Sequence, residues 1–377
     1  MIYGFLQCKK LMNIVCERNL FANAISNVIK ASSPKAVLPV LEGVLLKANK
    51  NSVELCCFDL KIAIKRTIAA NVIEEGEIVL SASTLNNIAS SIKSETITIT
   101  TDTNLVANIK GGRSKFKVAG ISPSDFPLLP EVNREKAATV SALEFKNNLK
   151  QSLFAATTNN TNPIFAGVNI NLKNGSMIFR ATDSYKFIKR TIPATGDDFN
   201  CIISAKESSD IVKIIPDNID NISLYVSTSH AVFIIEDYTV ITRLVAGTFP
   251  DFKAIEEKKY ESAVIVNCKD LLNTIHRVSL VNIDRLPKPM ICSITNKTID
   301  VSTNGYLGNS EDTCDLISFS GKEITIGLSS KHLESILANI SDENIKIEFS
   351  DERTPITIKP VEKNNFLAFM APMVVSA

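Results

Sequence analysis

The chain has 377 residues, 45% of them hydrophobic, and a formal net charge of +1 at pH 7. This length and apolar content are sufficient for about three cores of ordinary domain size. The nearly neutral charge excludes a polycation that coats nucleic acid indiscriminately. The sequence has no apolar run near the roughly 18 residues that span a membrane, so we expect no membrane partner.

The first segment, residues 1–11, places its lysines Lys9 and Lys10 after its apolar residues. A signal peptide has the opposite order, with the basic residues first. The residues that follow, beginning at Met12, have the pattern of a strand. We therefore interpret residues 1–11 as an N-terminal extension ahead of the first domain.

Two amphipathic helices recur along the chain with the same long period. One of them begins at Ser81, Ser204 and Ser329, which are 123 and 125 residues apart, and each start precedes apolar residues three and four apart. A period of this length indicates three copies of one whole domain. The other helix recurs in register with the first, over residues 20–29, 143–156 and 269–281.

The rest of each copy predicts strands. Several of these runs alternate apolar and polar residues, which is typical of a sheet with one covered face. The predicted strands cover residues 44–47, 53–57, 62–68, 77–80 and 96–100, then 167–172, 177–181, 187–192, 201–203 and 222–226, then 290–295, 298–302, 307–314, 323–328 and 345–349.

This order of elements predicts an α+β fold. Each of the three repeated domains is expected to pack two helices on one side of antiparallel sheets. We expect domain boundaries at 12–134, 135–258 and 259–377, after the extension at 1–11.

The sequence indicates no catalytic residue, cofactor or metal site. The eight cysteines form no CxxC motif and the three histidines are far apart, which argues against zinc or a disulfide framework and for a reducing, cytoplasmic location. The glycines of Gly111-Gly112-Arg113 lie between strands, so they do not form a phosphate loop. Asp183 could be a nucleophile, but we favour a turn residue that follows a strand.

Seven short runs carry a resemblance to a known family. They are Val37–Leu46, Phe58–Leu60, Gly112–Phe116, Asp125–Pro127, Ala181–Asp183, Leu244–Phe252 and Ala371–Met373. Together they resemble the bacterial DNA polymerase III beta subunit, the ring-shaped sliding clamp. The runs extend in order from about Met12 to the end of the chain and coincide with the threefold repeat.

The resemblance implies an accessory subunit without catalytic activity. Such a processivity factor encircles double-stranded DNA without sequence specificity, as a head-to-tail homodimer, and tethers DNA polymerases, the clamp loader and repair factors that carry a short clamp-binding peptide. Helix dimensions are consistent with a dimer: six helices about 10 Å wide enclose a bore of about 9 Å, and twelve enclose about 28 Å. A duplex about 20 Å wide fits only the larger bore.

Basic residues scattered over the helices suit contacts with phosphates, which add affinity without sequence information. The residues expected to face DNA are Lys30, Lys35, Lys93, Lys146, Lys150, Lys206, Lys213, Lys269, Arg277 and Lys331. The resemblance also suggests that residues 99–109 and 272–277 contribute to ring closure.

The resemblance places a peptide pocket between the second and third domains. Its wall is expected to comprise Phe165, Thr182, Ser184, Tyr185, Lys186, Phe187, Pro250, Ile255, Pro355, Phe369, Met370, Ala371, Pro372 and Met373. Apolar and sulfur-bearing side chains make an adaptable binding surface.

The chain departs from the family pattern at this pocket. The family usually has Thr-Asp-Gly-His-Arg-Leu where this chain has Thr182–Phe187, and an alanine, Ala371, replaces a methionine. Ala254 replaces a common arginine, and the tail after Met373 is longer and uncharged. We expect the pocket to persist with an altered peptide preference. A non-ring scaffold of three protein-binding domains, or a hydrolase that uses Asp183, is the alternative.

Overall fold

The computed structural model of the chain describes residues 11–33, 38–132, 136–157, 162–281, 288–305 and 307–375. The contacts of the backbone divide the chain into two compact units. Unit 1 comprises Met1–Leu143 and Asp210–Leu244, and unit 2 comprises Glu144–Ser209 and Val245–Ala377. Two helices, α3 (Ala142–Lys150) and α4 (Ala205–Ile214), contain residues of both units.

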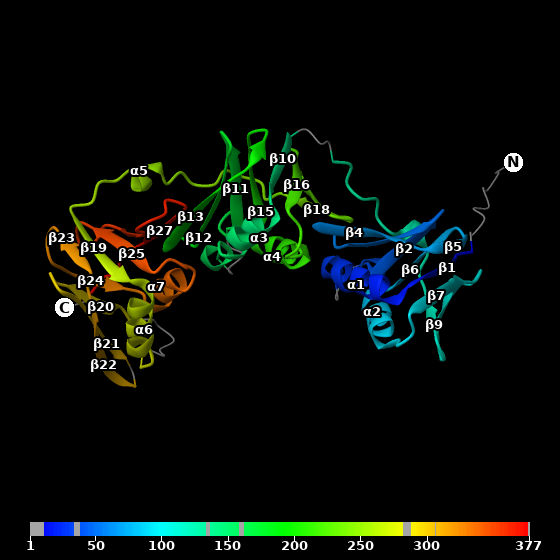
Figure 1. The fold of residues 1–377 in the computed structure, drawn as a ribbon, viewed down its shortest axis with the longest axis horizontal. Helices are drawn as coiled ribbons and strands as arrows, with labels where there is room; N and C mark the ends of the chain where they lie inside the picture. Colours follow the sequence, from blue (N-terminus) through cyan, green and yellow to red (C-terminus); the bar gives the residue numbers. More distant parts are fainter. Residues whose placement is uncertain are drawn as a thin grey trace. The chain divides into compact units, whose positions relative to one another are not determined.

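Unit 1 contains two antiparallel sheets, one with the order β5-β1-β7-β8-β9 and one that runs β10-β16-β17-β18-β4-β3-β2-β6. Helices α1 and α2 pack side by side against the second sheet (Figure 1). The elements of this unit are β1 (Asn13–Glu17), α1 (Arg18–Val28), η1 (Ile29–Ala31), η2 (Pro39–Glu42), β2 (Gly43–Asn49), β3 (Ser52–Phe58), β4 (Ile62–Ala69), β5 (Asn71–Glu74), β6 (Gly76–Ser81), α2 (Ala82–Ser91), β7 (Thr96–Thr101), β8 (Val106–Gly111), β9 (Ser114–Ala119), η3 (Pro123–Asp125), β10 (Lys136–Ser141), β16 (Asn221–Val226), β17 (His230–Ile235) and β18 (Tyr238–Arg243).

Unit 2 contains a nine-stranded sheet with the order β15-β11-β12-β13-β27-β26-β25-β19-β23 and a four-stranded sheet with the order β22-β21-β20-β24. Helices α6 and α7 pack against each other, and α6 also contacts β21 and β22. The further elements of this unit are η4 (Leu153–Ala155), β11 (Gly167–Lys173), β12 (Ser176–Thr182), β13 (Lys186–Pro193), β14 (Thr195–Gly196), β15 (Phe199–Ser204), α5 (Lys253–Glu256), β19 (Ser262–Asn267), α6 (Cys268–Ser279), β20 (Met290–Ile294), β21 (Thr298–Gly305), β22 (Gly308–Asp315), β23 (Ser318–Ser320), β24 (Ile324–Leu328), α7 (Ser330–Leu337), β25 (Asn344–Phe349), β26 (Ile356–Pro360) and β27 (Phe366–Met370).

A serine caps the second helix of every copy. Ser81 Oγ accepts a hydrogen bond from the backbone N–H of Thr84 at 3.4 Å, and Ser204 and Ser329 accept the equivalent bond three residues on, also at 3.4 Å. A serine at this position satisfies one of the unpaired N–H groups at a helix start, and its loss typically costs about 1 kcal/mol. The repeated serines therefore define where these helices begin.

The helix predicted over residues 143–156 ends sooner than its apolar stripe does. The α-helical part stops at Lys150, and a 3-10 turn over Leu153–Ala155 follows. Ser152 Oγ donates to the carbonyl of Asn148 at 2.7 Å. A serine hydroxyl that bonds the carbonyl four residues back competes with the backbone ladder and disturbs the helix.

The sheets join strands of successive copies. In unit 1, β4 of the first copy pairs with β18 of the second, and in unit 2, β13 of the second copy pairs with β27 of the third. Among the described residues, β9 and β22 have a neighbouring strand on one side only. The first and second copies therefore each extend a sheet with a strand from the next copy along the chain.

The cores are apolar, and buried thiols contribute to them. The seven described cysteines are unpaired and buried, and burial raises the pKa of Cys16, Cys56, Cys201 and Cys292 to about 12. The described residues contain no group of three or more His, Cys, Asp or Glu side chains suited to a metal ion. None of the described helices has both the length and the apolar character needed to cross a membrane.

Candidate functional site

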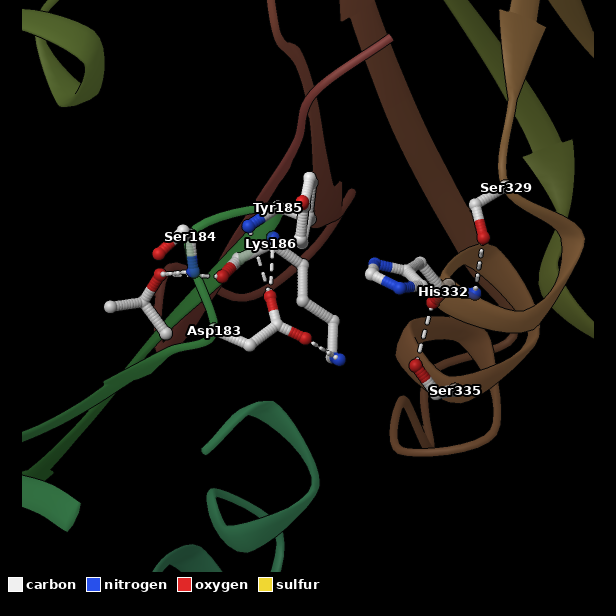
Figure 2. A network of polar contacts seen from close by, with 8 residues as sticks. Asp183, Ser184, Tyr185, Lys186, Ser329, His332 and Ser335 are labelled. Carbon is white, nitrogen blue, oxygen red and sulfur yellow. Dashed lines mark hydrogen bonds and ion pairs between the residues drawn. The ribbon is translucent and has the colours of Figure 1, made fainter. Parts of the chain in front are cut away.

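A tight turn between β12 and β13 begins the candidate peptide site. Asp183 Oδ1 accepts the backbone N–H groups of Tyr185 and Lys186 at 3.0 and 2.9 Å, and Asp183 Oδ2 pairs with Lys186 Nζ at 2.5 Å (Figure 2). Thr182 Oγ1 donates to the Lys186 carbonyl at 2.7 Å and accepts the Ser184 N–H at 3.1 Å. An aspartate that bonds the backbone two and three residues on is a standard turn former. The turn interpretation of Asp183 explains all of these contacts.

The electrostatics of the turn favour an ionised Asp183. Burial acts to raise the pKa of this carboxyl, but hydrogen bonds from Lys186 and Tyr185 and the charge of Lys186 outweigh it, so the pKa lies below its ordinary value. The Lys186 side chain is only 9% exposed, so the ion pair is largely removed from water. Both carboxylate oxygens are engaged in holding the turn.

We expect Asp183→Asn to lower the stability of the folded chain by about 1–3 kcal/mol at pH 7, because Lys186 loses its charged partner in a buried position. Because the pKa of Asp183 is lower in the folded state than in the unfolded state, its ionisation stabilises the folded state at pH values above the unfolded-state pKa. This stabilisation is lost as the pH falls through the folded-state pKa. The difference between variant and parent should therefore shrink in acid. Urea unfolding at pH 7 and near pH 3 measures this difference in the free energy of unfolding.

The matched control for this change is Asp251→Asn. Asp251 is exposed and accepts one backbone N–H, from Lys253 at 2.9 Å. We expect a much smaller change in the unfolding midpoint for this variant. Equal midpoints for parent and Asp183→Asn at both pH values contradict the structural role of Asp183.

His332, in the first turn of α7, faces this turn in unit 2. Its ring lies 5.9 Å from the ring of Tyr185, at an interplanar angle of 78° (Figure 2). Burial lowers the pKa of His332, and the charge of Lys186 lowers it further. The sequence did not identify His332 as a site residue, because its only recognisable role there is in the first turn of the helix that begins after Ser329.

An apolar cluster lies on the other side of β13. Phe187 and Phe369 are directly opposite in the β13–β27 pair, and their rings stack 5.3 Å apart. Phe252 stacks on Phe187 at 4.2 Å and 30°, and Phe249 and Ile202 complete the buried part. Phe187 and Phe369 are 2% and 3% exposed, so the accessible surface of the cluster belongs to its partly buried members.

Partly buried side chains form the rim of the cluster. They pack against its buried residues and are Ile164, Val245, Phe252, Ile255 and Leu367. The sequence analysis missed Phe249 and Phe252 as site residues, although both lie in the quoted Leu244–Phe252 run. Their aromatic side chains, on either side of a proline turn, are the signal that could have identified them.

The structure divides the predicted pocket residues between two faces of the sheet. Phe187, Ile255 and Phe369 belong to the apolar cluster. Lys186 and Met370 are opposite each other in the β13–β27 pair, and they lie on the other face because adjacent strand residues alternate. Thr182 is the last residue of β12. The remaining predicted residues lie in the connections and at the chain end: Phe165, Ser184, Tyr185, Pro250, Pro355, Ala371, Pro372 and Met373. Their role in a pocket stays a prediction.

Of the basic residues expected to face DNA, Lys35 lies outside the described residues. The others lie on or beside the helices: Lys30 in η1, Lys93 after α2, Lys146 and Lys150 on α3, Lys206 and Lys213 on α4, Lys269 and Arg277 on α6, and Lys331 on α7. Lys146 is partly buried, whereas Lys93, Lys150, Lys206, Lys269 and Lys331 are exposed.

Lys30, Lys213 and Arg277 contact other groups of the protein. Lys30 Nζ donates to Asn27 Oδ1 at 2.6 Å and to the Lys213 carbonyl at 3.1 Å, near the end of α4. Burial lowers the pKa of Lys30, and the Lys213 charge adds to this effect. Lys213 pairs with Asp210 at 3.1 Å, and Arg277 pairs with Asp312 of β22 at 2.6 Å. These contacts hold three side chains of the predicted DNA-facing set against the protein.

Comparison with known proteins covers most of the chain. Models of the N-terminal, central and C-terminal domains of the DNA polymerase III beta subunit match residues 12–130, 139–251 and 256–374. The chain belongs to the DNA polymerase III beta subunit family. It is therefore a sliding clamp, a non-catalytic processivity factor of DNA polymerase, and the α+β fold of three repeated domains is confirmed.

Individual relatives agree with the family assignment. The beta sliding clamp of Staphylococcus epidermidis is 27% identical over 374 residues, which cover 96% of this chain and 99% of that protein. The structure of the sliding clamp of Bacillus subtilis matches with a TM-score of 0.93 at 22% identity, over 97% of this chain and 100% of that one. The structure of the beta subunit from Streptococcus pyogenes matches with a TM-score of 0.92 at 26% identity, over 96% of this chain and 100% of that one.

Proposed function

We propose that two copies of this clamp close head to tail into a ring around double-stranded DNA, without sequence specificity. We further propose that DNA polymerases, the clamp loader and repair factors bind the apolar cluster through a short peptide. The pairing of strands between successive copies carries the ring proposal. A clamp of this kind acts on chromosomal DNA, so we propose a cytoplasmic location, and domains at 12–134, 135–258 and 259–377.

The repeat suggests which strands join two chains. Strands β4, β13 and β22 are equivalent in the three copies, as are β9, β18 and β27. Within the chain β4 pairs with β18 and β13 with β27, so among these six equivalent strands of the described residues β22 and β9 each keep one side without a neighbour. If β22 of one chain pairs with β9 of another, the strand pairing seen within each chain also occurs between the chains. A closed head-to-tail dimer contains two such junctions.

The charges of these two strands are complementary. β9 carries Lys115 and Lys117, and β22 carries Glu311 and Asp315, all four of them exposed. Opposite charges across a strand pair are stabilising, and they favour the correct partner over a like-charged one. The closing segment expected at residues 99–109 lies in β7 and β8, which have neighbours on both sides, so the edge strand β9 is the better candidate.

The helices provide the DNA-facing surface in this proposal. Each copy contributes two helices, so two chains contribute twelve, and twelve helices about 10 Å wide enclose a bore of about 28 Å. A duplex passes through such a bore with room for water. The exposed lysines of the helices offer phosphate contacts that carry no sequence information, which leaves movement along the duplex unhindered.

The decisive experiment compares DNA topologies. We expect the clamp, loaded by a clamp loader, to stay on nicked circular DNA through gel filtration and to leave the same DNA after it is linearised, because a ring slides off a free end. We also expect about twice the chain mass in solution. A monomer, or equal retention on both DNA forms, contradicts the ring and supports a non-ring scaffold.

A further inference from the structure

A cavity of about 510 Å³ lies beside the apolar cluster in unit 2, with Lys189, Lys258, Lys259 and Lys359 in its lining. We propose that this cavity is a second subsite, which binds acidic residues that flank the apolar anchor of a partner peptide. The inference rests on the proposed peptide site at the apolar cluster.

The cavity and the cluster share one face of the nine-stranded sheet. On β13, Phe187 belongs to the cluster, and Lys189, two residues further, lines the cavity. On β27, Leu367 lies opposite Lys189, packs against the cluster and also lines the cavity. Alternate strand residues share a face and lie about 7 Å apart. A peptide anchored on the cluster therefore reaches the cavity within two to four residues.

The carboxylates of the cavity are already neutralised by lysines. Glu256 pairs with Lys189 at 2.5 Å. Glu348 pairs with Lys346 at 2.8 Å and with Lys359 at 2.9 Å. Burial acts to raise the pKa of Glu348, but its bonds to these two lysines lower it by more, so this carboxylate is ionised at neutral pH. The two acidic side chains of the lining, Glu256 and Glu348, therefore offset the charges of Lys189 and Lys359, and in the part of the chain that the structure describes they form no ion pair with the other two lysines of the lining.

Lys258 and Lys259 supply the surplus positive charge. Both are exposed, and within the described ranges neither forms an ion pair with a carboxylate. Lys258 Nζ donates to Thr354 Oγ1 at 3.2 Å and lies 5.8 Å from the ring centre of Tyr260, another lining residue. These contacts orient one ammonium group at the cavity. Asp351, which accepts a hydrogen bond from Thr354 at 2.7 Å, is close enough for the Lys258 charge to lower its pKa, so Lys259 carries the larger share of the unpaired charge.

An acidic peptide segment fits this lining better than a compact anion does. Tyr260 and Leu367 provide apolar surface next to the lysines, and a peptide chain offers both apolar atoms and carboxylates. A carboxylate that approaches two exposed lysines gains affinity and encounter rate, and the gain falls with salt. The cavity therefore selects among partners by the charge that flanks their apolar anchor.

Fluorescence anisotropy with synthetic peptides tests the subsite. The neutral probe is a labelled hexapeptide with leucine and phenylalanine anchors, and two acidic probes add three glutamates at one end or the other. We expect one acidic probe to bind about threefold to tenfold more tightly than the neutral probe at low salt. Changing Lys258 and Lys259 together to glutamate should abolish this gain and leave the affinity for the neutral probe within about twofold.

A control variant separates the subsite from net charge. Lys173 and Lys297 are exposed lysines in or beside strand turns of unit 2, and changing both to glutamate alters the net charge equally. We expect this variant to keep the full gain of the acidic probe. Equal binding of neutral and acidic probes, or a gain that survives in the Lys258/Lys259 variant, overturns the subsite alone.

Two other outcomes also overturn the inference. Failure of the parent to bind the neutral probe rejects the apolar peptide site together with the subsite that depends on it. Reduced retention on circular DNA in the Lys258/Lys259 variant, with unchanged binding of the acidic probe, assigns these lysines to nucleic acid instead.

Discussion

Changing Lys146, Lys150, Lys206 and Lys269 together to glutamate is expected to reduce the amount of clamp retained on circular DNA by about tenfold or more at moderate salt. These lysines lie on α3, α4 and α6. Phosphate contacts supply affinity that does not depend on sequence, and removing a lysine that makes one weakens both the affinity and its dependence on salt. Glutamates at the same positions also repel the phosphates.

Retention is measured by gel filtration of loaded clamp on nicked circular DNA over a series of salt concentrations. The fold should survive, because the helix stripes that hold the core are untouched, and circular dichroism with thermal unfolding checks this. The matched control changes Lys50, Lys173, Lys297 and Lys322, which are exposed in or beside turns and loops between strands, to glutamate. This control alters the net charge equally on other surfaces.

The two quadruple variants should differ. Retention that falls only in the helix variant supports DNA-facing helices. Equal loss in both variants attributes the effect to net charge, and unchanged retention of the helix variant at moderate salt rejects the assignment of these lysines to the DNA surface.

The second large effect is expected at Phe187. Replacing it by alanine removes a ring that is 2% exposed and stacks on Phe252 at 4.2 Å and on Phe369 at 5.3 Å. Truncation of a buried phenylalanine typically costs about 3–5 kcal/mol of stability, because apolar burial is reduced and a cavity remains. The rim residue Phe252 loses the surface on which it rests, so peptide affinity should fall as well, by about 1–3 kcal/mol.

Milder variants separate stability from binding. Phe187→Leu keeps most of the volume, and Phe233→Leu makes the same change at a fully buried phenylalanine of unit 1. We expect both to lower the unfolding midpoint, but only Phe187→Leu to weaken binding of the neutral hexapeptide. Met373→Ala, at a partly exposed position, should weaken binding by about 1–3 kcal/mol with little loss of stability.

Peptide titrations of these variants decide whether the cluster is the binding site. Loss of affinity in Phe187→Leu, with parent-like affinity in Phe233→Leu, supports the cluster as the site. Loss of affinity in Met373→Ala extends the site to the end of the chain. Parent-like affinity in all three variants shows that the peptide binds elsewhere on the clamp.

Local patterns predicted the elements of this fold well. The helices that begin after Ser81, Ser204 and Ser329 lie where predicted, because capping and the spacing of apolar residues act within a few residues along the chain. The end of α3 at Lys150 was predicted too late, because the stripe continues past the point where the Ser152 hydroxyl disturbs the ladder.

The candidate site was predicted in part. The turn role of Asp183 follows from a polar residue between two strand patterns, and the structure supplies the contacts that confirm it. The stacking of Phe252 on Phe187 joins residues far apart in the sequence, and neither carries a local signal for the other. The proximity of His332 to Tyr185 depends in the same way on packing between the second and third copies.

The threefold repeat, the α+β class and the family resemblance could be read from the amino-acid order alone, because repeated spacing and motif identity need no knowledge of which segments meet. The choice of partner strands belongs to the tertiary structure: β4 pairs with β18 and β13 with β27 across copies, while β9 and β22 stay one-sided among the described residues. Strand patterns state which face is buried but not which neighbour supplies the hydrogen bonds. The same long-range pairing brings Lys189 beside Leu367, and so creates the lysine-lined cavity next to the apolar cluster.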